Sequence, residues 1–501
     1  VGYGAAPYAL PEGTTLAGWG ARPRRKRLPA FGGFGLVGRH AQRWMAQADA
    51  DGRPRLPLFR SERDDDRDEG PLGALGARAL VLRPEGQVAP FVIVRLDLVT
   101  SDADLHAAIL LRAEMRGVRQ ETLLVAATHT HSGPGGYSAN EASALFGTDH
   151  PFEAAKAAIV DAAAQAIERA FQAAVPARLA IARARDRDPA TGKPLLARNR
   201  RSAEDAIDDR VYALCFDERD SGTPIAVVLN HAVHPYLFRR RHMGFTRDLA
   251  GGLEEALGSR VGAPVLFVNG AQGDISTQPA DGGPAERIAT LSARFADVVA
   301  PAITEARKTP SRTLRMAAAR AERVMATPRA VLPFAGSREG VVEAVERPLT
   351  EVALAGTIAD VLAAPANVVL WSLAIPEVRI GFTFEGDLGA VVNLEPKMGN
   401  PPLAFGAWVF DTDTGRYALF AEPGEAMQAM GRAWRAAAAE RGIEDALVLG
   451  LTNGSCAYLT PTADYAQAGY EYDSTFFGRG TGDDATASLE LALDAALDLL
   501  R

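Results

Sequence analysis

Short apolar runs that end in polar, glycine-bearing segments are the most regular pattern in this sequence. Runs of four or five apolar residues occupy positions 123–127, 225–229 and 265–268, and runs of this length between turn-forming residues are typical of buried strands. The first run is followed by Thr-His-Thr-His-Ser-Gly-Pro-Gly-Gly at positions 128–136. Because α/β folds place functional groups just beyond the ends of such strands, we expect the site at these segments.

Strand-like and helix-like patterns alternate along the chain and predict an α/β fold. Strands at 79–82 and 91–97, a helix at 104–115 and the strand at 123–127 give a β-β-α-β opening, which is typical of a layered domain. Further helices are expected at 153–174, 284–306 and 426–440, and further strands at 378–380, 390–392 and 448–451. We therefore predict a layered sandwich with a mixed β-sheet core flanked by helices and an active site at the strand ends.

No clear linker divides the chain, so we expect one catalytic domain over residues 1–501. The region 311–420 carries alternating strand-like patterns and is the least regular part. A basic run at 22–27 and a mainly acidic run at 61–70 interrupt the first hundred residues. We expect the basic run to be a solvated surface loop, because the overall charge of the chain is negative. We expect the acidic run to be a surface loop as well, because it lacks the ligand spacing of an EF-hand.

The composition excludes several classes of function. Hydrophobic residues make up 47% and charged residues 23% of the chain, as in ordinary globular proteins, and the net charge of −8 argues against nucleic acid as a partner. No apolar stretch approaches the roughly 18 to 20 residues of a membrane span. Two cysteines, Cys215 and Cys456, are too few for a thiolate zinc site, and a bridge between them stays open. Any metal must therefore bind to histidine, carboxylate or tyrosine.

Histidines supply the first candidate ligands. Side chains alternate along a strand, so His129 and His131 are predicted to point to the same side. The pair is consistent with part of a zinc site, which needs three or four protein ligands, and equally with a hydrogen-bonded pair at a strand end. The run 225–229 leads to His231 and His234, and either could be a further ligand. His106 lies within a predicted helix and is expected to be a packing or surface residue.

Five segments, in this order, resemble the neutral/alkaline (non-lysosomal) ceramidase family. They are 128–136, Ala-Val-His-Pro at 232–235, Gly-Asp-Ile-Ser at 273–276, Pro-Gly-Glu at 423–425, and the tyrosine segment that contains Tyr458, Tyr465 and Tyr470. The first segment is fairly specific, whereas the others are specific only in combination. The resemblance extends over nearly the whole chain and is weakest at 311–420.

The resemblance implies a zinc ion held by His129, His234, Glu425 and Tyr458. Nitrogen and oxygen ligands of these kinds suit zinc and leave a position for water. Without the resemblance, Tyr458 reads as a buried tyrosine with a satisfied hydroxyl. The family pattern favours His234 over His231, because the second histidine directly precedes a proline.

The resemblance also implies the residues around the substrate. His131 would act as acid and base, Tyr470 would donate to the oxyanion, and Ser276 would contact the substrate, since no base is visibly paired with it. Arg200 matches a family arginine near the substrate, although Arg201 fits nearly as well. The implied activity is zinc-dependent hydrolysis of the N-acyl amide bond of ceramide, or a ceramide-like substrate, by metal-activated water.

Departures from the family leave other functions open. We expect the family's C-terminal β-domain to be absent; in addition, Thr-Gln-Pro at 277–279 replaces the usual Pro-Asn, and Ala-Gly at 468–469 replaces Gln-Arg. A smaller N-acyl amide, an ester or a lactone would then be the substrate, or the chain would be an inert lipid-binding or scaffold protein that keeps the metal. We expect a small-molecule or lipid amide as partner, with peripheral membrane contact permitted, and the resemblance alone suggests secreted or periplasmic localisation.

Two other hydrolase folds that use histidine-bound metals are disfavoured. A TIM-barrel amidohydrolase also begins with His-x-His, but it needs eight regular strand–helix repeats that this sequence lacks. In a metallo-β-lactamase-like hydrolase, an Asp-His pair would stand where this chain has Ser132 and Gly133.

Overall fold

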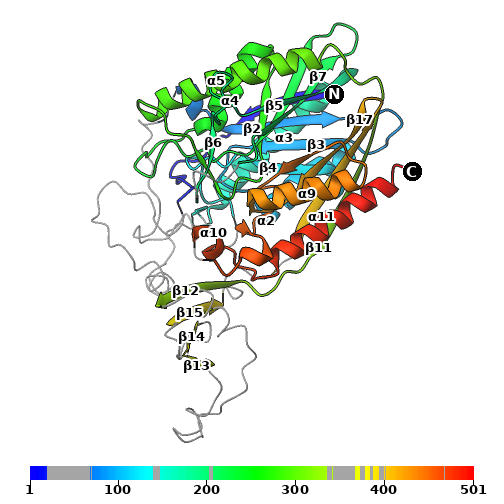
Figure 1. Ribbon diagram of the computed structural model, residues 1–501. Helices are drawn as coiled ribbons and strands as arrows, with labels where there is room; N and C mark the ends of the chain where they lie inside the picture. The colour runs from blue at the N-terminus through cyan, green and yellow to red at the C-terminus, as the bar shows by residue number, and fades with distance from the viewer. Residues whose placement is uncertain are drawn as a thin grey trace, which may run out of the picture.

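The computed structural model describes most of the chain (Figure 1). The described residues are 1–19, 68, 70–138, 147–149, 151–201, 207–335, 341, 367–372, 378–383, 388–393, 400, 402–467 and 469–501. The basic run 22–27, almost all of the acidic run 61–70, and Ala468 lie outside them.

Three four-stranded sheets with the same strand pattern form the body of the protein (Figure 1). In each sheet the first three strands are antiparallel and the fourth runs parallel to the third. In sheet order, the strands are β1 (Gly2–Pro7), β2 (Gly76–Leu82), β3 (Phe91–Leu96) and β4 (Leu123–Ala127); β5 (Ala177–Arg185), β7 (Arg210–Glu218), β8 (Pro224–His231) and β9 (Val265–Asn269); and β11 (Leu314–Arg323), β16 (Leu403–Thr412), β17 (Gly415–Ala421) and β19 (Asp445–Leu449).

Each of these sheets is covered by a pair of helices on its outer face. The pairs are α2 (Ala103–Ala113) with α3 (Glu153–Gln172), α4 (Asp248–Val261) with α5 (Pro284–Ala306), and α9 (Gln428–Glu440) with α11 (Thr481–Asp498). The inner strands of each sheet, such as β3 and β16, are buried on both faces, because the inner faces of all three sheets share a central core that includes Ile93, Leu214 and Trp408. The predicted layered α/β fold with mixed sheets is confirmed.

The last strands of the three sheets meet at one end of the central core. The Ala127 N–H donates to the carbonyl of Leu451, and the Gly450 N–H donates to the carbonyl of Asn269, at 3.1 Å each. The segments that follow β4, β9 and β19 therefore lie next to one another.

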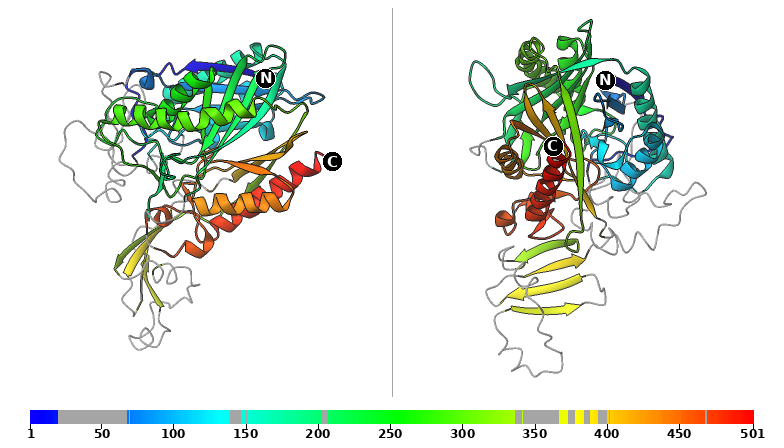
Figure 2. Two further views of the ribbon diagram at one scale, coloured as in Figure 1. Left: turned by 45° about the horizontal axis from the view of Figure 1, so that its top comes forward. Right: turned by 90° about the vertical axis from the view of Figure 1, so that its right-hand side faces the viewer.

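Smaller elements complete the fold. A fourth sheet, antiparallel in the order β12-β15-β14-β13, projects from the body (Figure 2), and the Arg329 N–H of β12 donates to the carbonyl of Phe476 at 2.6 Å. Its strands are β12 (Arg329–Ala335), β13 (Asn367–Ser372), β14 (Val378–Thr383) and β15 (Leu388–Asn393). The other short elements are β6 (Ala197–Asn199) paired with β10 (Ile275–Thr277), β18 (Glu425–Ala426) paired with β20 (Tyr458–Leu459), α10 (Tyr470–Asp473), and the 3-10 turns η3 (Gly70–Gly73), η4 (Glu114–Arg116), η5 (Gln120–Thr122) and η7 (Thr462–Asp464).

Most predicted elements are present, and the structure adds strands and helices that were not predicted. No strand was predicted over residues 2–7, yet this segment forms β1. A Cβ at either glycine would lie 2.0 or 2.1 Å from a carbonyl oxygen of α3, so only glycine lets the helix pack this closely on the strand.

Two expectations about the chain as a whole can be checked in the described residues. Cys215 and Cys456 are both buried and free, so they do not form the bridge that the sequence left open. In the part of the chain that the structure describes, no helix is both long enough and apolar enough to span a membrane.

Candidate metal centre

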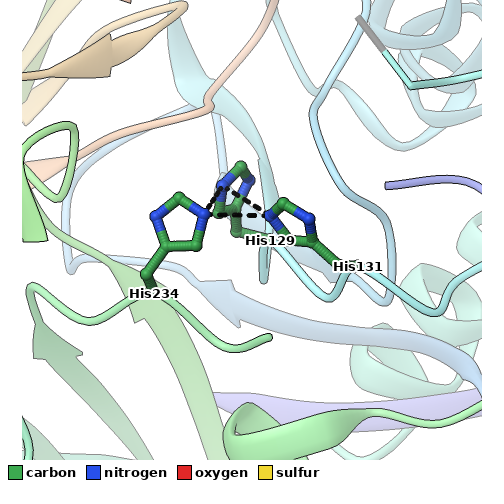
Figure 3. Close-up of side chains that lie close together, drawn as sticks. All are labelled: His129, His131 and His234. Atoms are coloured by element: carbon green, nitrogen blue, oxygen red, sulfur yellow. Dashed lines mark hydrogen bonds between the residues drawn. The ribbon is translucent and has the colours of Figure 1, made fainter. Parts of the chain in front are cut away.

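Three histidines converge at the ends of two strands from different sheets (Figure 3). His129 and His131 follow β4, and His234 follows β8. The Nε2 atoms of His129 and His234 are 3.1 Å apart, those of His129 and His131 are 3.2 Å apart, and those of His131 and His234 are 3.0 Å apart. The three nitrogens thus form a nearly equilateral triangle.

This spacing fits a single metal ion. Nitrogens bound to a tetrahedral zinc at about 2.0–2.1 Å would be roughly 3.3–3.4 Å apart. The observed distances are only a few tenths of an ångström shorter. The three imidazoles can therefore hold a metal ion.

The backbone places His129 differently from the way the strand pattern suggested. His129 and His131 do face one common point, as predicted, but β4 already ends at Ala127, so strand alternation is the wrong reason. His129 instead has a φ of 70°, in the left-handed region that β-strand residues do not use. Such strained residues concentrate at functional sites, where the surrounding structure holds them.

Protonation states at this site favour cation binding. The ring Nδ1 of His129 lies 2.5 Å from the carbonyl oxygen of Val99, and an N–H there leaves Nε2 available as a ligand. Burial, followed by the neighbouring His129 and His131, lowers the pKa of His234 well below its ordinary value. His234 is therefore neutral at physiological pH, which is the form that binds metals.

Glu425 adds a carboxylate to the histidine cluster. Its Oε2 lies 3.3 Å from Nε2 of His129 and accepts a hydrogen bond from the Gln272 side chain at 3.4 Å. Burial alone would raise the pKa of Glu425, but His129, the hydroxyl of Tyr458 and Arg200 lower it to about 2. The carboxylate is therefore ionised and ready for a cation.

Tyr458 lies directly opposite Glu425, because β18 and β20 pair these two residues in register. Its hydroxyl hydrogen-bonds Glu425 and accepts from Arg200 at 3.3 Å. Burial, followed by the Glu425 charge, raises the pKa of Tyr458 well above its ordinary value. The hydroxyl is therefore protonated here. A bound cation would have to lower the pKa of Tyr458 before the phenol oxygen became a strong ligand.

Arg200 and Arg201 occupy separate environments. Arg200 donates to Oε1 of Glu471 at 2.8 Å, and its guanidinium carbon lies 5.4 Å from the ring centre of Tyr470. Arg201 instead stacks over Tyr472 at 4.5 Å and donates to Oε1 of Gln467 at 2.8 Å. Of the two arginines, Arg200 is thus the one beside the candidate site.

Tyr470 and Ser276 both lie near the histidine cluster. The ring of Tyr470 contacts that of Tyr458 at a centroid distance of 5.4 Å, and 63% of Tyr470 is exposed. Ser276 is buried on β10, and its Oγ lies 2.7 Å from the hydroxyl of Tyr236. The structure therefore brings all eight predicted site residues into one neighbourhood.

His231, the rival to His234, lies outside this cluster. Its Nε2 is 3.3 Å from Oδ2 of Asp186, its Nδ1 faces the carbonyl oxygen of Arg210, and its ring stacks on Phe295. This buried pair leaves His231 no part in the histidine triangle.

Comparisons with known proteins test the family resemblance. The family model described as neutral/alkaline non-lysosomal ceramidase, N-terminal, matches residues 64–251. The predicted resemblance to the neutral/alkaline ceramidase family is confirmed. The matched region contains His129, His131, Arg200 and His234, while Glu425 and the tyrosines lie beyond it.

One relative supports the family resemblance, and two solved structures share the fold. The neutral ceramidase of Pseudomonas aeruginosa is 33% identical over 150 residues, which are 28% of this chain and 22% of that protein. The crystal structure of neutral ceramidase from the same organism covers 99% of this chain and 74% of its own, with a TM-score of 0.66 and 19% identity. A ceramidase complexed with C2 gives a TM-score of 0.66 at 20% identity and covers 100% of this chain and 75% of its own. At these identities the solved structures establish the fold, whereas the sequence matches cover only part of each protein.

Two aromatic residues beside the histidine cluster were missed by the sequence analysis. Tyr236 lies against His234 at a ring distance of 4.5 Å and against His131 at 5.6 Å. Trp19 meets His131 edge to face at 5.3 Å. Tyr236 could have been found, because it directly follows the His-Pro pair of a predicted motif. Trp19 carries no comparable signal, since it comes from a distant part of the chain.

Proposed function

We propose that this chain is a zinc-dependent amidohydrolase that cleaves the N-acyl amide bond of ceramide or a closely related lipid amide. The observation that carries the proposal is the triangle of His129, His131 and His234 beside the ionised carboxylate of Glu425. The ceramidase family match over residues 64–251 supports the same reaction class.

We assign zinc to His129, His234, Glu425 and Tyr458. Two imidazoles, a carboxylate and a phenol oxygen suit zinc, and they are poor ligands for softer metals that prefer thiolates. The hydrogen bond from Tyr458 to Glu425 shows that both oxygens already face one another. When bound, zinc would lower the pKa of a water ligand to roughly 7 and polarise the acyl carbonyl.

The remaining residues would handle the proton and the oxyanion. We assign to Nε2 of His131 the transfer of a proton from the attacking water to the departing nitrogen, because it is 3.2 Å or less from both ligand histidines. A carbon–oxygen bond forms and the carbon–nitrogen bond breaks, which gives a carboxylic acid and an amine. Tyr470 lies beside the Arg200 guanidinium, and its hydroxyl would donate a hydrogen bond to the oxyanion.

Ser276 and Tyr236 would then contact the rest of the substrate. Their hydroxyls are paired at 2.7 Å next to His234, where they can bind a substrate hydroxyl or amide. In the described residues no histidine is hydrogen-bonded to Ser276, which agrees with a binding role rather than a nucleophilic one.

A second role also fits His131. Its Nε2 is as close to the other two nitrogens as they are to each other, so it can serve as a third imidazole ligand. Metal content separates the two roles, because an acid–base residue can be removed without loss of the ion.

The proposed function is tested by turnover of a panel that contains N-acyl sphingosines of different chain length, simple N-acyl amides, an ester and a lactone. Each compound is assayed before chelation, after chelation and after zinc is added back. We expect N-acyl sphingosine to be hydrolysed, the activity to disappear on chelation and zinc to restore it. If the enzyme preferred a simple amide, an ester or the lactone, that compound class would be its substrate instead of the lipid. If the protein bound metal but hydrolysed none of the compounds, it would be an inert lipid-binding or scaffold protein.

A further inference from the structure

Three consecutive arginines form an exposed turn that the reaction does not use. Residues 239–241, here called the arginine turn, are all exposed. Among the ion pairs of the described residues, none involves Arg239, Arg240 or Arg241. The three adjacent positive charges therefore form a basic patch on a protein whose net charge is −8.

The turn is held firmly at its base. The backbone N–H groups of Leu237 and Phe238 donate to the two carboxylate oxygens of Asp248, at 3.0 and 2.8 Å. The His242 N–H closes the turn on the carbonyl of Arg239 at 2.8 Å, and the His242 ring packs on Phe238 at 4.5 Å. The arginines are therefore presented by an ordered backbone and are not spread along a flexible tail.

This turn lies next to the candidate metal centre. The Arg239 guanidinium carbon is 5.4 Å from the ring centre of Tyr236. The same tyrosine ring contacts His234 and His131, and its hydroxyl contacts Ser276. The single side chain of Tyr236 thus lies between the Arg239 guanidinium and the histidine cluster.

We propose that the arginine turn is an electrostatic docking site for an anionic lipid bilayer, which holds the site against the membrane surface. The choice of a bilayer rests on the proposed function, because a lipid amide resides in a membrane and must be reached there. The net negative charge of the chain would repel an anionic surface in most orientations, so the turn also selects the orientation that faces the site to the lipid.

Binding of the full chain to vesicles tests this proposal without any turnover. Sedimentation is compared for vesicles of phosphatidylcholine alone and of phosphatidylcholine mixed with phosphatidylglycerol, at low and high salt. The wild-type chain should bind the anionic vesicles and release them at high salt. Since each arginine near such a surface contributes about 1 kcal/mol, the triple variant Arg239→Gln, Arg240→Gln, Arg241→Gln should lower the partition coefficient on the order of 100-fold.

A matched control removes the same charge elsewhere. Arg83, Arg178 and Arg432 are exposed at scattered positions, and their triple change to Gln should leave binding within a few-fold of wild type. Both triple variants should hydrolyse a detergent-dispersed substrate at the wild-type rate, which shows that they are folded and keeps this test separate from that of the proposed function. Three results would overturn the proposal. The two triple variants could bind anionic vesicles equally well, or the wild-type chain could bind neutral vesicles as well as anionic ones. Soluble glycerol phosphate could also displace the wild-type chain from anionic vesicles at constant ionic strength.

Discussion

His129 and His234 place their Nε2 atoms 3.1 Å apart, although 105 positions separate them in the chain. They belong to loops that leave two different sheets, and Asn269 at the end of β9 connects these loops. Its side-chain amide donates to the carbonyls of Thr128 at 3.4 Å and Val233 at 2.8 Å, and its Oδ1 accepts from the Val233 N–H at 3.1 Å. One buried asparagine thus bridges the residues that precede both histidines.

Asn269→Ala should therefore weaken metal binding although it removes no ligand. Loss of the groups that orient ligands typically lowers metal affinity about 10–100-fold. Competition with a zinc chelator gives the affinity. Asn453→Ala is the matched control, because Asn453 is also buried and bonds to Leu123 and Val125 of β4, away from the histidine loops. Equal affinity for the two variants would show that Asn269 does not hold the histidines together.

Gly273→Ala should displace Glu425. An added Cβ at Gly273 would lie 2.5 Å from the carbonyl oxygen of Glu425, and backbone at this distance has to move. We expect a loss of metal affinity of at least about tenfold, as for other errors in ligand positioning. Gly283→Ala serves as control, because nothing lies within 4 Å of the position of its Cβ. A crystal structure of Gly273→Ala with Glu425 unmoved would contradict this account.

The roles of His131 and Tyr470 can be separated by measuring metal and rate together. His131→Ala and Tyr470→Phe should keep the metal and lower kcat, by about 10²–10⁴ and 10²–10³ respectively, because each removes a proton donor rather than a ligand. Metal content is measured on the same preparations as kcat. Loss of metal from His131→Ala alone would make His131 the third imidazole ligand.

The stability of the protein should depend on pH through His106, far from the metal centre. Burial, with the nearby Arg320, lowers the pKa of His106 from 6.5 to about 4. The unfolded chain therefore takes up a proton near pH 6.5 that the folded chain accepts only near pH 4, so stability falls as the pH drops through this range. The effect is about 3 kcal/mol at most.

His106→Gln should lack this part of the pH dependence. Urea unfolding of chelated wild type and variant at several values between pH 7 and pH 4 gives the two free energies of unfolding. Their difference should shrink by about 3 kcal/mol toward low pH. Parallel curves would mean that His106 takes up its proton equally in both states.

The sequence was sufficient where a pattern is local. The strands β4, β8 and β9 and the helix α5 follow from runs of apolar residues or helical periodicity over their own length. The helix α4 was missed because Gly251 and Gly252 lower helix propensity. The structure explains Gly252 by packing, since a Cβ there would lie 2.3 Å from Ile288 of α5. That contact joins positions far apart in the chain.

The candidate site shows the same division. The motifs named eight residues that the structure brings into one neighbourhood, and their roles as metal ligands and catalytic groups stay predictions. The reason given for the common direction of His129 and His131 was wrong. Asn269, Tyr236 and Trp19 act through contacts between distant segments, and no local pattern reports such contacts.

The central claim is that His129, His234 and Glu425 bind one catalytic zinc ion. The most direct test is the metal content of the purified wild type, His129→Ala, His234→Ala, Glu425→Gln and His231→Asn, measured by mass spectrometry alongside hydrolysis of N-acyl sphingosine. We predict one zinc per chain and full activity for the wild type, retained metal in folded His231→Asn, and loss of both metal and activity in the other three. A wild-type chain that turns over substrate without metal, or ligand variants that keep a full equivalent of zinc, would contradict the account.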